Sequence, residues 1–199
     1  QNILYAMGVN ENTPDSGVNF IPTDVVEGKF EERIKGQYVL VNGEVQKDDQ
    51  AFLIDVRKQL AALKQGNEAR LPIFVGEKEG EEVYVLPMYG KGLWDAIWGY
   101  VALDKDMIVR GAFFDHAGET PGLGAEIKDN KAWKKQFTGK SFYNEEGEYT
   151  GIGVIKGGAK DYTWQVDGIS GATITADGVQ EMLVRGLKYY APVLEEKEN

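Results

Sequence analysis

Cysteine is absent from this 199-residue chain, and histidine occurs once, as His116. Without cysteine the chain cannot form disulfides, thiolate metal sites or a cysteine nucleophile. A single histidine cannot make a histidine-rich metal site, so we expect no metal centre and assign His116 a structural or surface role. No run of 18 apolar residues occurs either, so no stretch of this sequence has the length of a membrane-spanning helix.

Basic residues are outnumbered, because 22 Lys and Arg stand against 32 Asp and Glu, for a formal net charge of −10. A nucleic-acid-binding domain normally has a basic patch, and no such cluster occurs here, so we expect no nucleic-acid partner. The acidic end, residues 195–198, is expected to be a solvated tail. Hydrophobic residues make up 42% of the chain and aromatic residues 11%, which is enough for a core and for stacking on a flat ligand.

Strand patterns separated by turn residues are the main local signal, and Asn42-Gly43 is a strong two-residue hairpin signal. The expected strands are residues 38–41, 73–75, 83–86, 98–103, 107–114, 148–156 and 162–166. The expected helices are residues 29–35, 49–65, 129–137 and the end of the chain, with a loop at 87–93, a helical turn at 94–98 and a loop at 115–125. Strands in adjacent hairpins with segregated helices predict an α+β fold, with mostly antiparallel sheets and a C-terminal helix.

The N-terminal part of the chain is less regular than the rest. The length suits one domain, in which residues 1–70 could form a subdomain ahead of a main domain at residues 71–199. The helix expected over residues 49–65 has an apolar face made of Phe52, Val56, Leu60 and Leu63. Gly66 suits the position just after its last turn.

The most informative stretch is Asp167-Gly168-Ile169-Ser170-Gly171-Ala172-Thr173. A helix pattern follows it at once, with an apolar face made of Val179, Met182, Leu183, Leu187 and Tyr190. Thr175 or Asp177 is expected to cap this helix, and Asp177-x-x-Gln180 has the capping-box spacing. Thr173 therefore lies just before a helix N-terminus, where unpaired N–H groups favour a phosphate. An ordinary tight turn into a capped helix is the structural alternative.

Two further loops are candidates for ligand contacts. Glu119-Thr120-Pro121-Gly122-Leu123-Gly124 follows a strand pattern, and its backbone amides could bind the polar edge of a heterocycle, although a structural turn explains it too. Gly90-Lys91-Gly92-Leu93-Trp94 places an indole beside glycines. That Trp94 is either a core residue or an exposed surface for stacking.

Together these segments resemble the FMN-binding domains of the C subunit of the Na⁺-translocating NADH:quinone oxidoreductase and of the related G subunit of the Rnf complex. Asp-x-x-Ser-Gly-Ala-Thr is similar to the family's flavinylation motif, whose last Thr, here Thr173, carries FMN through a phosphoester bond. Glu-Thr-Pro-Gly-Leu-Gly matches a signature that lines the flavin, and Gly-x-Gly-Leu-Trp is typical of the C-subunit branch.

The resemblance implies covalent FMN as the cofactor, and it makes residues 71–199 an FMN-binding domain. The implied flavin contacts are Asp167, Ser170, Gly171, Ala172, Glu119, Thr120, Leu123, Gly124, Gly92, Leu93, Trp94 and Lys156, in addition to Thr173. We expect the ring to lie between Trp94 and Leu123. Lys156 precedes two glycines, and it either faces the N1/O2 edge of the flavin or is simply solvated.

The implied function is that of an electron-transfer protein between NADH oxidation and quinone reduction in a sodium-pumping respiratory complex. Its implied partners are the other subunits and an FMN transferase. Because the sequence begins at Gln1 and resembles the C subunit from Asn2 on, we expect a missing N-terminal anchor in the bacterial inner membrane, with this domain on the periplasmic side. The alternatives are an Rnf-type domain, a non-covalent flavin- or phosphate-binding module without a relay role, and a hydrolase, against which the lack of a nucleophile–base pair counts.

Overall fold

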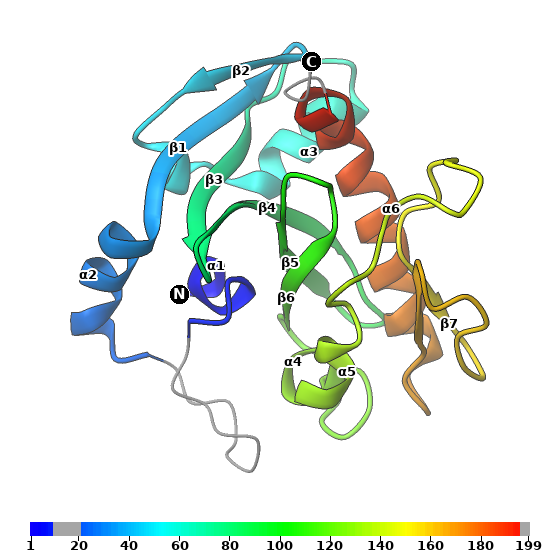
Figure 1. The fold of residues 1–199 in the computed structure, drawn as a ribbon. Helices are drawn as coiled ribbons and strands as arrows, with labels where there is room; N and C mark the ends of the chain where they lie inside the picture. The colour runs from blue at the N-terminus through cyan, green and yellow to red at the C-terminus, as the bar shows by residue number, and fades with distance from the viewer. Residues whose placement is uncertain (10–20, 196–199) are drawn as a thin grey trace.

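The structure is a computed structural model that describes residues 1–9 and 21–195, so the acidic tail beyond residue 195 lies outside the described residues. A six-stranded sheet in the order β2-β1-β3-β4-β5-β6 forms its centre (Figure 1). All neighbouring strands are antiparallel. The strands are β1 Ile34–Val41, β2 Glu44–Lys47, β3 Leu71–Lys78, β4 Glu81–Lys91, β5 Ala96–Leu103 and β6 Val109–His116. This sheet and its segregated helices confirm the α+β prediction.

Tight turns set the register of the sheet. Asn42 and Gly43 join β1 to β2 with φ angles of 51° and 83°, which is the left-handed geometry that the Asn-Gly pair predicts. Glu79 and Gly80 join β3 to β4 in the same way, with φ angles of 55° and 84°. Because side chains alternate along each strand, these registers also decide which residues face each layer of helices.

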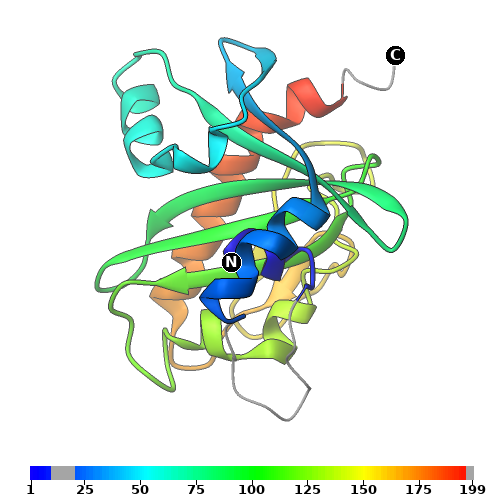
Figure 2. The same cartoon turned by 90° about the vertical axis from the view of Figure 1, so that its left-hand side faces the viewer.

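Helix α6, Thr173–Glu195, covers one face of the sheet, and α1, Asn2–Ala6, and α2, Thr23–Arg33, lie on the other (Figure 2). Glycines bring α6 close to β4. A Cβ atom at Gly178 would lie 2.3 Å from the carbonyl oxygen of Lys91, and one at Gly186 would lie 2.9 Å from Met88. The predicted apolar face of α6, from Val179 to Tyr190, is buried against the sheet.

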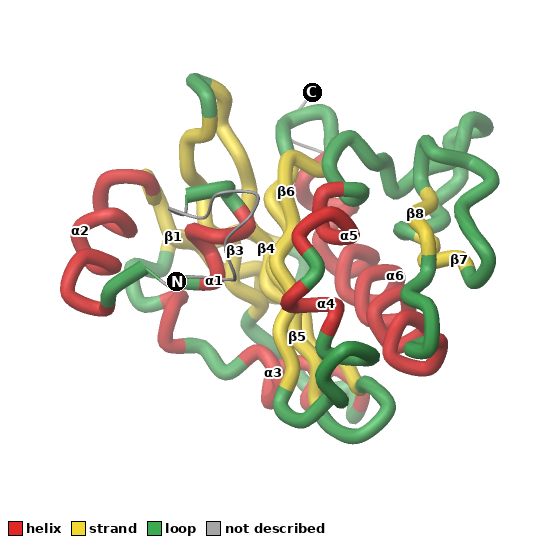
Figure 3. Tube along the Cα trace, turned by 90° about the horizontal axis from the view of Figure 1, so that it is seen from below, coloured by secondary structure: helices red, strands yellow, loops and turns green. Residues whose placement is uncertain are grey.

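A second, two-stranded sheet lies on the far side of α6. Its strands β7, Gly153–Ile155, and β8, Gln165–Asp167, are parallel. From below, α6 lies between this pair and the large sheet (Figure 3). These strands are shorter than those expected at 148–156 and 162–166. Turns stabilised by side-chain hydrogen bonds occupy part of these segments, for example where the Thr163 N–H donates to the Asp161 carboxylate.

The N-terminal region contributes to the same sheet as the later strands, since β1 pairs with β3 along most of its length. Tyr5 of α1 contacts Phe113 on β6, with ring centroids 5.1 Å apart. Helix α2 begins at Thr23, earlier than the helix expected at residues 29–35. The division of the chain near residue 70 stays a prediction.

The single helix expected over residues 49–65 is wrong. The segment forms a 3₁₀ turn, η1 Ala51–Leu53, and a separate helix, α3 Val56–Lys64. Asp55 interrupts it, because its carboxylate accepts the Lys58 N–H and starts a new helix as an N-cap. As a consequence Phe52 is 56% exposed rather than buried, whereas Gly66 ends α3 at a φ of 74° as expected.

The loop expected at 87–93 is wrong for residues 87–91, because β4 continues to Lys91, and only residues 92 and 93 lie outside the strand. The helical turn expected at 94–98 is wrong, because β5 begins at Ala96. The glycines that suggested a loop instead make room for neighbours. A Cβ at Gly90 would lie 2.9 Å from Met182. Similarly, the helix expected at 129–137 is two helices, α4 Glu126–Asp129 and α5 Lys131–Lys135, separated by Asn130, which caps the second.

Candidate functional site

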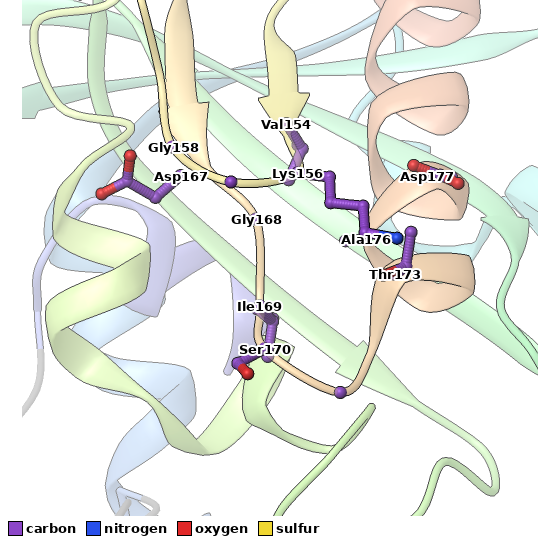
Figure 4. Close-up of a pocket in the computed structure, with 12 residues that line it drawn as sticks. Val154, Lys156, Gly158, Asp167, Gly168, Ile169, Ser170, Thr173, Ala176 and Asp177 are labelled. Atoms are coloured by element: carbon purple, nitrogen blue, oxygen red, sulfur yellow. The ribbon is translucent and has the colours of Figure 1, made fainter.

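A cavity of about 500 Å³ opens between the ends of β7 and β8 and the start of α6 (Figure 4). Its volume falls within the roughly 300–1,000 Å³ of small-molecule sites. Five of the residues singled out from the sequence line it, namely Lys156, Asp167, Ser170, Gly171 and Thr173. Its other walls are Val154, Gly157, Gly158, Gly168, Ile169, Ala176 and Asp177.

Helix α6 begins at Thr173, so the predicted caps Thr175 and Asp177 are wrong. The Ala176 N–H donates to the Ala172 carbonyl at 2.9 Å, which makes buried Ala172 the residue before the first turn. An alanine there offers no side-chain acceptor to the N–H groups of that turn. The chain reaches this position through Gly171, whose φ is 75°. The start of α6 thus presents backbone donors and the Thr173 hydroxyl together.

The loop 156–159 forms the opposite wall, and Asp167 holds it in place. The Asp167 carboxylate accepts the Ala159 N–H at 2.8 Å. The backbone of Asp167 is itself fixed, because its N–H donates to Gln136 at 2.9 Å and its carbonyl accepts the Trp133 indole N–H at 2.7 Å. Asp167 therefore shapes the cavity wall through the protein's own hydrogen bonds.

Lys156 lies on this wall, and its ammonium group points toward the first turn of α6 near Thr173 and Ala176 (Figure 4). The two walls are tied together by Gln180, whose side-chain oxygen accepts the Val154 N–H at 2.7 Å. Sequence reasoning missed this contact, because it gave Gln180 a capping-box role instead. Its position seven residues after Thr173 marks the same helix face, two turns on, and this spacing is the signal that could have found it.

Glu119 joins the three segments that carry the sequence motifs. It is only 5% exposed, and its carboxylate accepts hydrogen bonds from the Thr175 hydroxyl at 2.5 Å and the Trp94 N–H at 3.0 Å. Glycines make room for it, since Cβ atoms at Gly92 and Gly124 would lie 2.5 and 2.4 Å from its carboxylate oxygens. Glu119 thus lies beneath the surface and ties the loops to α6.

The pKa of Glu119 reflects this position. Burial by itself raises the pKa of this carboxyl, but the hydrogen bonds from Thr175 and from backbone N–H groups around Trp94 outweigh burial and hold the pKa below its usual value. His116 has a structural role beside it, because its ring Nδ1 accepts the Glu119 N–H at 3.1 Å. Among residues 1–9 and 21–195, no group of acidic residues and histidine is arranged to hold a metal ion.

Exposed apolar side chains lie on the segments that Glu119 connects. Trp94 is 67% exposed, so the alternative of a core residue is wrong, and its indole N–H donates to the Thr120 hydroxyl at 3.2 Å. Leu123 adjoins Gly171, where a Cβ would lie 2.7 Å from the leucine side chain. We use the term apolar rim for four exposed side chains, those of Leu93, Trp94, Leu123 and Ile174. Ile174 was missed from sequence, although it follows Thr173 directly and lies off the buried face of α6.

The site therefore combines two chemically different parts. The cavity has glycine walls, one ammonium group and the start of a helix, which suit a phosphate and a polyol chain. The apolar rim outside it suits a flat aromatic ring. A ligand with a phosphate at one end and a heterocycle at the other, such as FMN, fits these residues.

Comparison with known proteins agrees with this geometry. Residues 92–188 match the family model of the FMN-binding domain. The chain is 35% identical over 187 residues to the C subunit of the Na⁺-translocating NADH-quinone reductase of Vibrio alginolyticus, and the match covers 89% of this chain and 72% of that protein. The chain belongs to this C-subunit family. The resemblance drawn from the motifs is thereby confirmed.

Solved structures of the C-subunit family share this fold. The crystal structure of the family member from Parabacteroides distasonis has a TM-score of 0.81 and 37% identity, over 98% of this chain and 89% of that one. The corresponding protein of Shewanella oneidensis has a TM-score of 0.74 and 26% identity, over 98% and 95%. Within the part that the structure describes, no helix combines the length and apolar character needed to cross a membrane.

Proposed function

We propose that this member of the C-subunit family carries FMN covalently, through a phosphoester bond to Thr173, and relays electrons inside a Na⁺-translocating NADH-quinone reductase. When bound, FMN supplies reversible one-electron chemistry. The observation that carries the proposal is the position of Thr173, which is the first residue of α6 and lines a cavity of about 500 Å³.

The choice of Thr173 over Ser170 follows from their places in the chain. Both line the cavity, but Ser170 belongs to the turn before the helix, whereas Thr173 begins the helix. A phosphate on Thr173 would meet the N–H groups of the first turn and the ammonium group of Lys156. Gly171, with its positive φ, keeps the approach to that hydroxyl free of a side chain.

The ring would lie on the apolar rim rather than in the cavity. The indole of Trp94 and the side chain of Leu123 are exposed, and both belong to loops tied to α6 through Glu119. Stacking on an aromatic side chain adds about 0.5–1.5 kcal/mol beyond the burial of area. Glu119 and Thr120 would position these side chains rather than contact the ring, because their polar atoms already form hydrogen bonds with Trp94 and Thr175.

Covalent attachment is tested by producing the chain with and without an FMN transferase and measuring intact mass. We expect one FMN per chain, less one water, only when the transferase is present. Thr173→Ala should abolish the fluorescent band in a denaturing gel, whereas Ser170→Ala, the matched control in the same turn, should keep it. A fluorescent band in Thr173→Ala would refute the assignment and favour a non-covalent flavin module.

The relay role also has a direct test. A relay must exchange electrons reversibly with its neighbours, so the flavinylated domain should show a reversible redox titration and restore quinone reduction to a complex lacking this protein. We also propose, from the family resemblance, an N-terminal anchor that holds the domain on the periplasmic face of the inner membrane. A topology reporter fused to the full-length gene product, after the residue numbered 195 here, tests whether the domain lies on the periplasmic side. A cytoplasmic signal from the reporter would contradict this proposal.

A further inference from the structure

The cavity walls carry an unusual balance of charge for a phosphate site. Its charged lining residues are one cation, Lys156, and two carboxylates, Asp167 and Asp177. The Asp167 carboxylate already accepts the Ala159 N–H at 2.8 Å, so one of its oxygen atoms is engaged by the protein itself. Within residues 1–9 and 21–195, neither Lys156 nor Asp177 has an ion-pair partner, so both charges remain available to a ligand.

Among the charged groups on the surrounding elements, Lys140 is buried outside the cavity and attracts Asp167, so it offsets part of the charge of that carboxylate. Glu119 lies under the first turn of α6, where its carboxylate accepts hydrogen bonds from Thr175 and Trp94. Glu181, one turn beyond Asp177 on α6, pairs with Arg185 at 2.7 Å. The N-terminus of α6 adds about half a positive charge next to Thr173. Asp177 follows Thr173 by four residues, so its carboxylate lies on the same face of the helix as the Thr173 hydroxyl.

We infer that this cavity selects a singly charged phosphodiester on Thr173, with Lys156 as its counter-ion, and disfavours the doubly charged phosphate of unattached FMN. The inference rests on the proposed function, since FMN is the ligand. A phosphate monoester has a second pKa near 6 and carries two charges at pH 8. A diester carries one charge at any pH above about 2, because esterification removes the second acidic proton. Attachment to Thr173 would therefore both tether the flavin and remove the charge that Asp177 repels.

The test uses the unmodified chain, produced without a transferase and confirmed flavin-free by intact mass. It is titrated with riboflavin, FMN and the monomethyl ester of FMN, which imitates the linked diester, at pH 8 and pH 5. One extra like charge in a partly hydrated site should weaken binding about three- to tenfold. We therefore expect the ester to bind about three- to tenfold more tightly than FMN at pH 8, and the two affinities to converge at pH 5.

Variants separate the roles of the two charged side chains. Asp177→Asn should close the gap between FMN and its ester at pH 8. Lys156→Gln should weaken binding of the ester but leave riboflavin unaffected. Glu181→Gln, on the same helix but outside the cavity, is the matched control and should keep the gap. FMN binding as tightly as its ester at pH 8, or a gap that survives Asp177→Asn, would overturn the inference.

If free flavins bind too weakly to titrate, a second measurement tests whether Lys156 is the counter-ion of the linked phosphate. In flavinylated protein, Lys156→Gln should lower the melting temperature by more than it does in unmodified protein. Equal lowering in both forms would overturn the role of Lys156. Failure of the transferase to modify Thr173 would refute the proposed function instead, and the titrations of the unmodified chain would still measure the charge preference of the cavity.

Discussion

Replacing Glu119 tests whether one buried carboxylate holds the site together. In Glu119→Ala the Thr175 hydroxyl, which is buried, and the N–H of Trp94 both lose their acceptor. An unsatisfied buried donor costs about 1–3 kcal/mol, so we expect a loss of about 3 kcal/mol in the free energy of unfolding. For a chain of this size that corresponds to a melting temperature lower by about 6–12 °C.

Glu119→Gln isolates the contribution of charge. The amide keeps one acceptor oxygen, while each charge-assisted bond weakens by about 1 kcal/mol, so the expected loss at pH 7 is about 2 kcal/mol. Because the folded state lowers the pKa of Glu119, its stabilising effect is complete above the unfolded-state pKa of about 4.3. The effect disappears as the pH falls through the lower pKa of the folded state. The difference between native protein and Glu119→Gln should therefore shrink in acid.

Urea denaturation followed by circular dichroism at pH 7, 5 and 3.5 measures this difference. Glu146→Gln is the control, because Glu146 is exposed on a turn and its replacement should change stability by less than about 0.5 kcal/mol. A Glu119→Gln loss that is absent at pH 7, or that stays constant down to pH 3.5, would show that the carboxylate does not stabilise the loops in the way described.

Three further predictions concern the packing and the surface of the site. Gly178→Ala places a Cβ 2.3 Å from the Lys91 carbonyl oxygen and should lower the free energy of unfolding by about 1–3 kcal/mol. The control is Gly28→Ala on α2, where a Cβ meets nothing within 4 Å, and this change should be neutral or stabilise the protein by up to about 1 kcal/mol. Equal effects of the two changes in thermal melts would contradict the close approach of α6 to β4. Trp94→Leu should brighten native flavin fluorescence in the flavinylated protein, because the indole would no longer quench a stacked ring, and unchanged emission would move the ring away from Trp94. Asp55→Ala removes the N-cap of α3 and should cost about 1 kcal/mol without altering flavin incorporation, so reduced incorporation would count against a purely local role.

Local patterns in the sequence were sufficient for several elements of this protein. The Asn42-Gly43 turn depends on two adjacent residues that tolerate positive φ, and the apolar face of α6 depends on a repeat within one helix. The motif segments were also recognisable because each is contiguous in the chain. Local signals failed where they were ambiguous. Gly90 was interpreted as a loop residue although it belongs to β4, and Asp55 was not recognised as a cap inside an apolar repeat.

Only the tertiary structure decided how the site is assembled. Glu119 and Thr175 are 56 positions apart and belong to different elements, so no pattern along the chain could predict their hydrogen bond. The same holds for Lys156, whose place opposite the start of α6 depends on Gln180 binding β7. Exposure was equally undetermined, because an indole beside glycines suits a core or a surface, and the packing of neighbouring loops around Glu119 leaves Trp94 in solvent. Sequence determines local conformation through contacts between near neighbours, whereas this site depends on contacts that exist only after the sheet and α6 have packed together.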